Sequence, residues 1–317
     1  MDDRPSILVV GGANLDIQAR SDAAFMGGDS NPGRAWSSPG GVGRNIAECA
    51  ARLGARVELF APLGDDAEGE SLATACGLAG IGTDRCPRLP GARTGRYVCL
   101  IDSDGTLVGA VSDMEIMERL GPDDLDAARP LIDASSIIVA DANLRPDTLA
   151  RLFDLAARVR KPVCLDTVSD AKARRIAGIA GRAALVKPNR AEAAALTGWP
   201  VRTASEAAAA ARELRRRGTG EIYLSMGAEG LVWLGETSGG FARLPDRPEA
   251  VNVSGAGDAA LAALARWARS GRSMPERAAL ALAAAALAAA SPSAAPDALD
   301  ENEVIKLSQG VVHEPLP

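Results

Sequence analysis

Short apolar runs alternate with helical patterns along most of the chain, which predicts a mostly parallel sheet with helices on its faces. Six runs have the length and apolar content of buried strands: residues 6–12, 56–64, 136–143, 162–169, 183–189 and 221–227. Each run ends in polar or glycine residues, as ligand-binding loops at the carboxyl ends of parallel strands do. The pattern therefore predicts an α/β fold with a ligand site along one edge of the sheet.

Two segments break this alternation. Residues 14–38 are too polar and irregular for a strand followed by a helix, and residues 96–111 form a hairpin pattern around Asp104-Gly105. We expect both in a small β-rich lid, made by about residues 14–38 and 94–113, on a single domain spanning 1–317. A second hairpin pattern, residues 230–245, predicts an antiparallel edge of the main sheet.

Composition narrows the function classes. The net charge of −6 argues against a nucleic-acid platform, and only 4 of the 35 basic residues are lysines, none of them after a glycine. A Walker A loop, which needs Gly-Lys, is therefore excluded. The five scattered cysteines predict neither a disulfide framework nor a zinc site, and they favour the reducing cytoplasm.

No segment resembles a signal peptide or a membrane span. The Ala-rich stretch 277–296 is expected to form a packed interior helix, so no membrane contact is predicted. The single histidine, His313, is expected in a solvated tail, which argues against histidine-based acid–base chemistry.

The segment "NVSGAGDAALAALARW" places glycines at the start of an apolar helical stripe. Free amides of Gly255, Ala256 and Gly257 can converge there on an anion, aided by the helix dipole. Asp258 would stand beside that anion as a base that deprotonates a hydroxyl during phosphate transfer. A Gly-rich turn followed by an ordinary first-turn aspartate explains the same residues.

Two further segments suit a polyhydroxylated ligand. In "PGGVGRNIAECAARLG", glycines crowd a helix entrance and Asn45 offers both a donor and an acceptor for vicinal hydroxyls. In "VVGGANLDI", Asp16 follows the first strand and can accept hydrogen bonds from sugar hydroxyls. A tight turn and a helix cap remain the alternatives for these two segments.

Two other segments suit a nucleotide. Asn189 and Glu192 are three residues apart at a helix start, where they could hold waters on a magnesium ion that bridges phosphates. A helix cap with a first-turn glutamate explains them equally. In "SMGAEGLVWL", Ser225, Gly227 and Gly230 close a strand where a flat ligand could approach the backbone.

Together and in this order, these features resemble the ribokinase-like (PfkB) carbohydrate and nucleoside kinase family over nearly the whole chain. The resemblance implies a Rossmann-like α/β/α sandwich with a β lid, and transfer of the γ-phosphate of ATP to a primary hydroxyl. It implies Asp258 as the catalytic base and residues 255–257 as the anion hole. It also implies a Mg²⁺ ion that Glu192 binds through a water molecule. The implied nucleotide-binding residues are Lys187, Asn189, Ser225, Gly227 and Gly230. The implied substrate-binding residues are Asn14, Asp16, Ser30, Asn31, Gly40, Gly41, Asn45, Thr94, Asp113 and Asp141.

The segments "DSNPG", "VADANL" and "LDTVSDAKA" resemble the pseudouridine kinase branch of that family. This implies pseudouridine as the substrate, phosphorylated at its 5′-hydroxyl. Separately, an exposed β lid has edges and an apolar face to cover, so a homodimer joined through the lids is expected. Many relatives carry Asp-Thr-Thr where this chain has Asn252-Val253-Ser254, which leaves a monovalent-cation site open. Another nucleoside, a free sugar, or a binding protein without turnover are the alternative functions.

Overall fold

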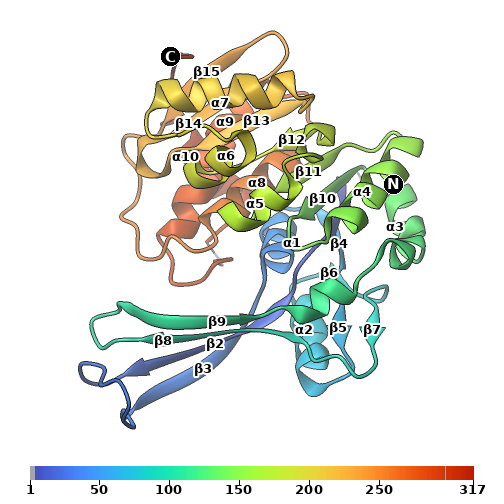
Figure 1. The fold of residues 1–317 in the computed structure, drawn as a ribbon. Coiled ribbons are helices and arrows are strands. Elements are labelled where there is room, and N and C mark those ends of the chain that lie inside the picture. The colour runs from blue at the N-terminus through green and yellow to red at the C-terminus, as the bar shows by residue number, and fades with distance from the viewer. Residues whose placement is uncertain (1–3, 297) are drawn as a thin grey trace.

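The largest sheet has ten strands and runs through the middle of the molecule (Figure 1). The computed structural model describes residues 4–296 and 298–317. In sheet order the strands are β16 (Val312–Pro315), β15 (Gly239–Arg243), β14 (Leu231–Leu234), β13 (Glu221–Ser225), β12 (Leu185–Val186), β11 (Val163–Asp166), β10 (Ile137–Asp141), β1 (Ser6–Val10), β4 (Arg56–Phe60) and β6 (Ile81–Gly82). The strands from β13 to β6 are parallel, and β14, β15 and β16 form an antiparallel edge. The predicted α/β fold class is confirmed.

Helices cover both faces of this sheet because alternate side chains of its strands point to opposite sides. In β1, Ile7 and Val9 join one hydrophobic core, and Leu8 and Val10 join the other. The first core contains residues of α1 (Val42–Arg52), α2 (Ala67–Leu78), α8 (Ala256–Trp267), α9 (Met274–Ala289) and α10 (Glu301–Ser308). The second contains residues of α3 (Arg129–Ala134), α4 (Pro146–Arg158), α5 (Asp170–Ile176), α6 (Arg190–Thr197) and α7 (Ala204–Arg216).

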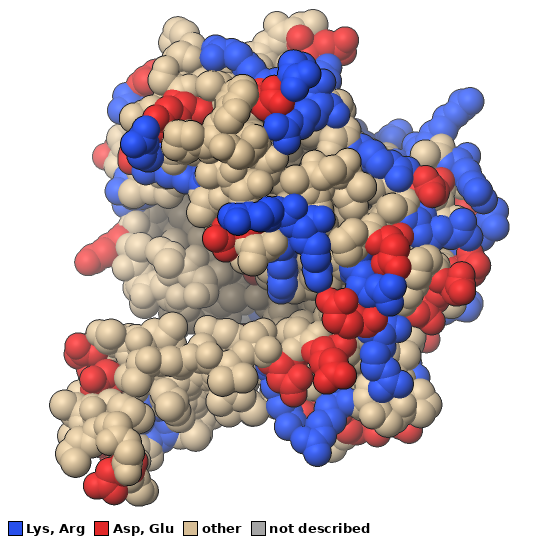
Figure 2. All heavy atoms as spheres, viewed as in Figure 1, with Lys and Arg blue, Asp and Glu red and all other residues tan. Residues whose placement is uncertain are grey.

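A separate four-stranded sheet forms the lid and projects from the main body (Figure 1). Its order is β3 (Gly33–Gly40), β2 (Asn14–Ser21), β8 (Gly95–Ile101) and β9 (Leu107–Asp113). Strands β2, β8 and β9 fall within the segments expected for the lid, and β3 extends beyond residue 38 to Gly40. Figure 2 shows a hollow between this sheet and the main body.

Prolines shorten two of the predicted strands, because a proline has no N–H to donate to a strand ladder. Pro188 follows closely on β12, which pairs over only two residues. Pro62 divides the run 56–64 into β4 and β5 (Leu63–Gly64), and β5 pairs with β7 (Arg88–Leu89) outside the main sheet. The prediction of one strand over 56–64 was therefore wrong, and the strand predicted over 183–189 is present but shorter.

His313 lies in β16 and not in an unpaired tail. It is exposed, but its backbone pairs with Ala242 of β15 at the edge of the main sheet. The expectation of a solvated tail was therefore wrong for its backbone. The Ala-rich stretch does form a packed helix, α9, and no helix of the described residues is long and apolar enough to cross a membrane.

All five cysteines are buried and carry free thiols. Cys99 lies in the lid strand β8, whereas Cys164 lies in β11 at the centre of the main sheet. Burial raises the pKa of the Cys164 thiol to about 12. These thiols are therefore uncharged and packed.

Candidate active site

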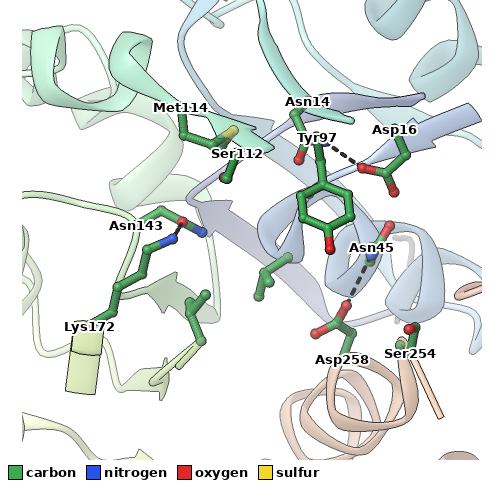
Figure 3. Close-up of a pocket in the computed structure, with 14 residues that line it drawn as sticks. Asn14, Asp16, Asn45, Tyr97, Ser112, Met114, Asn143, Lys172, Ser254 and Asp258 are labelled. Carbon is green, nitrogen blue, oxygen red and sulfur yellow. Dashed lines mark hydrogen bonds between the residues drawn. The ribbon is translucent and has the colours of Figure 1, made fainter. Parts of the chain in front are cut away.

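A cavity of about 350 Å³ lies between the lid and the carboxyl ends of the central parallel strands (Figure 3). Ligands in open α/β sheets bind at this edge, where the loops following the strands meet. The residues that line the cavity are Asn14, Asp16, Gly41, Val42, Asn45, Tyr97, Ser112, Met114, Asn143, Val168, Lys172, Ser254, Gly255 and Asp258.

Asp258 stands in the first turn of α8, at one end of the cavity. The helix begins after Gly255, whose φ of 82° is left-handed and where a Cβ would lie 2.5 Å from the Ala294 backbone. Within the described residues, the amides of Gly257 and Asp258 find no protein acceptor, while the Ala256 amide faces the Val253 carbonyl at 3.4 Å. The free amides at this helix start suit an anion.

The Asp258 carboxyl is held by α1, because Asn45 Nδ2 donates to Asp258 Oδ2 over 3.0 Å (Figure 3). Loss of hydration inside the site raises the pKa of Asp258 to about 7, and the negative charge of Asp166 adds to the rise. Hydrogen bonding from Asn45 and the charge of Lys187 act in the opposite direction. A carboxyl with this pKa can take up a proton near neutral pH, as a general base must.

Lys187 lies beneath this helix start, just after β12. Its Nζ lies 3.5 Å from Asp166 Oδ2, and a Cβ on Gly257 would lie 3.1 Å from the same Nζ. Burial alone lowers the pKa of Lys187, but the neighbouring carboxylates outweigh it and hold the pKa above its usual value. The ammonium therefore stays charged beside the turn that begins α8.

Asn189 and Glu192 form a reciprocal cap at the start of α6. The Asn189 side chain accepts from the Glu192 amide, and Glu192 Oε2 accepts from the Asn189 amide over 2.9 Å. Thr167 Oγ1 also donates to Glu192 Oε2, over 2.7 Å. The cap proposed as the alternative is thus present, and Glu192 lies buried beside Lys187 and Asp166.

Asn14 and Asp16 lie at the start of the lid strand β2, and both line the cavity. Asn14 Nδ2 donates to Asp16 Oδ1 over 2.6 Å, and burial raises the pKa of Asp16. The backbone of Gly40 lies directly against this carboxylate, and Gly41, at φ 98°, begins α1 with a Cβ position only 2.6 Å from Gly12 O. Three predicted sugar ligands, Asp16, Gly41 and Asn45, therefore share this cavity with Asp258.

Six residues predicted to bind substrate are not in the cavity lining: Gly40, which lies behind Asp16, and Ser30, Asn31, Thr94, Asp113 and Asp141. Of these, Ser30 and Asn31 are the farthest along the lid. Ser30 and Asn31 lie in the exposed turn between β2 and β3, where Asn31 Oδ1 accepts from the Met26 amide. Thr94 is buried and donates to Asp66 Oδ1 over 2.6 Å. The Asp141 carboxylate is fully buried and accepts from the amides of residues 12 and 143.

The predicted nucleotide residues meet at the ends of two neighbouring strands. Ser225 ends β13 and forms a parallel bridge with Asn189. Gly227 and Gly230 flank the short 3₁₀ helix that follows, both with positive φ. These residues lie on the side of Lys187 and Glu192, outside the cavity lining. Their role in nucleotide binding stays a prediction.

Residue-by-residue reasoning missed one wall of the cavity, formed by Met114, Asn143, Val168 and Lys172. Asn143 and Val168 follow β10 and β11, so their place after two apolar runs was the available signal. None of Asn143, Val168 and Lys172 belongs to a glycine-rich motif, but all lie in "VADANL" or "LDTVSDAKA", the segments that resemble the pseudouridine kinase branch, and that resemblance was a second signal.

A family model of the pfkB family carbohydrate kinases matches residues 4–301. The chain belongs to this family. The ribokinase-like fold agrees with it: the structure of Arabidopsis thaliana ribokinase complexed with ribose and ATP aligns at a TM-score of 0.84 and 24% identity, over 96% of this chain and 99% of that one.

Two curated relatives of this PfkB family kinase come from Escherichia coli. Pseudouridine kinase is 34% identical over 84% of this chain and 84% of its own length. The uncharacterized sugar kinase YeiI is 31% identical over 95% of this chain and 82% of its own length. Both similarities support a kinase of the PfkB family.

Proposed function

We propose that this PfkB family kinase transfers the γ-phosphate of ATP to the 5′-hydroxyl of pseudouridine. The observation that carries the proposal is the position of Asp258: a carboxyl with a pKa near 7, at the end of a cavity and beside unpaired helix amides. Phosphoryl transfer needs a proton acceptor and an anion site close together, and this helix start offers both.

The proposed step is a direct displacement. Asp258 accepts the proton of the 5′-hydroxyl, the oxygen bonds to the γ-phosphorus, and the bond to the bridging oxygen breaks with ADP as the leaving group. The free amides at this helix start and the Lys187 ammonium stabilise negative charge on the transferred group. Asn45 keeps the Asp258 carboxyl pointed at the acceptor.

The chain offers oxygen ligands that fit Mg²⁺, because Asp166 and Glu192 lie together beside the anion-binding turn. No group of three or more His, Cys, Asp or Glu side chains is arranged as a metal site in the described part of the chain. The ion would therefore be held largely by phosphate oxygens and waters, with Glu192 bound through water. When present, it neutralises phosphate charge.

Pseudouridine is proposed as the acceptor because a curated pseudouridine kinase shares 34% identity and because the cavity has a second wall beyond the sugar-binding groups. YeiI supports a free sugar as the second candidate acceptor. A binding protein without turnover is the third candidate. The free amides of the 255–258 turn and the raised pKa of Asp258 oppose it.

A substrate panel tests the assignment. We expect ADP and a product heavier by one phosphate with pseudouridine, at a kcat/KM at least tenfold above that with uridine, ribose or fructose. The measurement is coupled ADP release with mass detection of the product. Preference for any of the other three acceptors would contradict the substrate, and binding of pseudouridine without ADP formation would favour the binding protein.

We also propose that two copies pair through their lids. Apolar side chains are exposed on both hairpins of the lid sheet: Trp36, Val98, Leu100, Leu107, Val108 and Val111. Val98 pairs with Val111, and Leu100 lies two residues from Val98, so these three side chains share one apolar face, which favours burial against a second surface. Light scattering should give the mass of a dimer, and Val111→Glu, at a side chain that is 68% exposed, should shift it to a monomer. A monomeric wild type would contradict this.

A further inference from the structure

The cavity wall opposite Asp258 carries two polar side chains that the proposed transfer step does not use. Figure 3 shows Asn143 and Lys172 side by side, across the cavity from Asn45 and Asp258. Asn143 follows β10, and Lys172 comes from α5, which follows β11. Two successive strands of the main sheet therefore place this pair at the site.

Lys172 and Asn143 are bonded so that both face the cavity with donors. Lys172 Nζ donates to Asn143 Oδ1, which fixes the amide with its Nδ2 directed elsewhere. Among the described residues, the hydrogen bonds of Asn143 involve its backbone amide, its backbone carbonyl and its Oδ1, and none is donated by Nδ2. The ammonium also makes no second hydrogen bond there and has no carboxylate within 4.0 Å. Unpaired N–H groups on the wall of a cavity suit a ligand that brings acceptors.

The backbone around the pair is fixed by buried hydrogen bonds. Asp141 Oδ1 accepts from the Asn143 amide over 2.8 Å, and Asp141 Oδ2 accepts from the Gly12 amide over 2.8 Å. Burial lowers the pKa of Lys172, while the nearby charge of Asp141 opposes this change. Asp141 is thus a positioning residue for the pair.

A strained turn places an apolar side chain next to the two donors. Val168 has a φ of 64°, a left-handed conformation that a β-branched residue rarely adopts, and its amide donates to Asp166 Oδ1 over 2.7 Å. It lines the cavity together with Met114 and the ring of Tyr97. Such side chains can contact the faces of a flat ring while the donors meet its edge.

We propose that Lys172 and Asn143 bind carbonyl oxygens of a nucleobase, and thereby favour uracil-type nucleosides over amino-bearing ones and over free pentoses. This rests on the proposed function only in taking a nucleoside as the acceptor. A uracil ring presents two carbonyl oxygens, whereas a cytosine ring replaces one of them with an amino donor that would face N–H groups. A free pentose leaves the wall unfilled.

The test is calorimetric binding without ATP, so that it does not depend on turnover. The full chain is titrated with pseudouridine, uridine, cytidine and ribose. We expect wild type to bind uridine at least tenfold more tightly than cytidine. Lys172→Met should weaken pseudouridine and uridine binding by about 10- to 100-fold, as loss of a hydrogen bond to a charged group does. Ribose binding should change less than threefold.

Two further variants sharpen the test. Asn143→Asp keeps the shape of the side chain but replaces the donor Nδ2 with an acceptor, so uridine binding should weaken at least tenfold. Lys306→Met, at an ammonium-bearing side chain that is 76% exposed on α10, is the matched control and should bind as wild type does. Equal weakening of ribose and uridine in Lys172→Met would overturn the proposal, as would unchanged uridine binding or equal affinity of wild type for uridine and cytidine.

The two proposals fail in different ways. If wild type binds uridine and cytidine as expected but phosphorylates no pseudouridine, the proposed function is contradicted. The binding of the nucleobase by Lys172 and Asn143 is then unaffected. If wild type phosphorylates pseudouridine but Lys172→Met loses no affinity for it, nucleobase binding by Lys172 and Asn143 is contradicted. The proposed kinase function is then unaffected.

Discussion

Asp258→Asn is expected to lower kcat by at least about 100-fold, because the amide cannot accept the proton that a general base removes. The shape of the side chain is kept, so Asn45 keeps a partner and pseudouridine should bind within about threefold of wild type. Single-turnover formation of the phosphorylated nucleoside measures the loss. Turnover close to that of wild type would refute the role of Asp258.

The pH dependence supplies an internal control for this variant. With the pKa of Asp258 near 7, kcat/KM of wild type should fall as the pH drops below about 7, and the residual activity of Asp258→Asn should lack that inflection. Stability should move in the opposite sense, because the raised pKa means that the fold favours the protonated carboxyl, and this contribution is lost as the pH rises through about 7. At pH 8 the variant should therefore have a higher Tm than wild type.

Lys187→Met is expected to cost about 3–5 kcal/mol in the free energy of unfolding, the range seen when one partner of a buried ion pair is removed. Lys187 is only 4% exposed, and its loss leaves Asp166 and Glu192 buried without their counter-ion. The anion-binding turn also loses its cation, so activity should fall below detection. Urea unfolding followed by circular dichroism measures the stability.

A paired variant separates charge from packing at this position. Asp166→Asn added to Lys187→Met removes one uncompensated carboxylate, so the double variant should recover part of the lost stability. Additive losses in the double variant would show that the ammonium acts through its packing. A single variant as stable as wild type would contradict the buried charge cluster altogether.

The sequence predicted the fold where hydrophobic periodicity was strong. The stripe of Ile46 and Leu53 and that of Leu261 and Leu264 became buried faces of α1 and α8. Strand limits were predicted less well, because apolar content continues through Pro62 and Pro188 while the hydrogen-bond ladder does not. The periodicity of apolar residues indicates which side chains are buried, whereas a proline ends a strand by removing a backbone hydrogen-bond donor.

The site was predictable only where a motif fixes backbone geometry. Gly41 and Gly255 have left-handed φ values, and such glycines are visible in a sequence as crowded Gly pairs. Lys172 and Asn143 lie on ordinary backbone, and their meeting depends on the order of β10 and β11 in the sheet. Local patterns carry no information on such distant contacts.

The buried thiols allow local opening of the structure to be measured by their rate of chemical labelling. Cys99 in the lid and Cys164 in the central strand can react with an alkylating reagent only when their surroundings open. Labelling of Cys99 therefore reports separation of the lid strands, whereas labelling of Cys164 reports global unfolding. If pseudouridine slowed only the first rate, ligand binding and lid motion could be followed in the unmodified protein, with no engineered dye site.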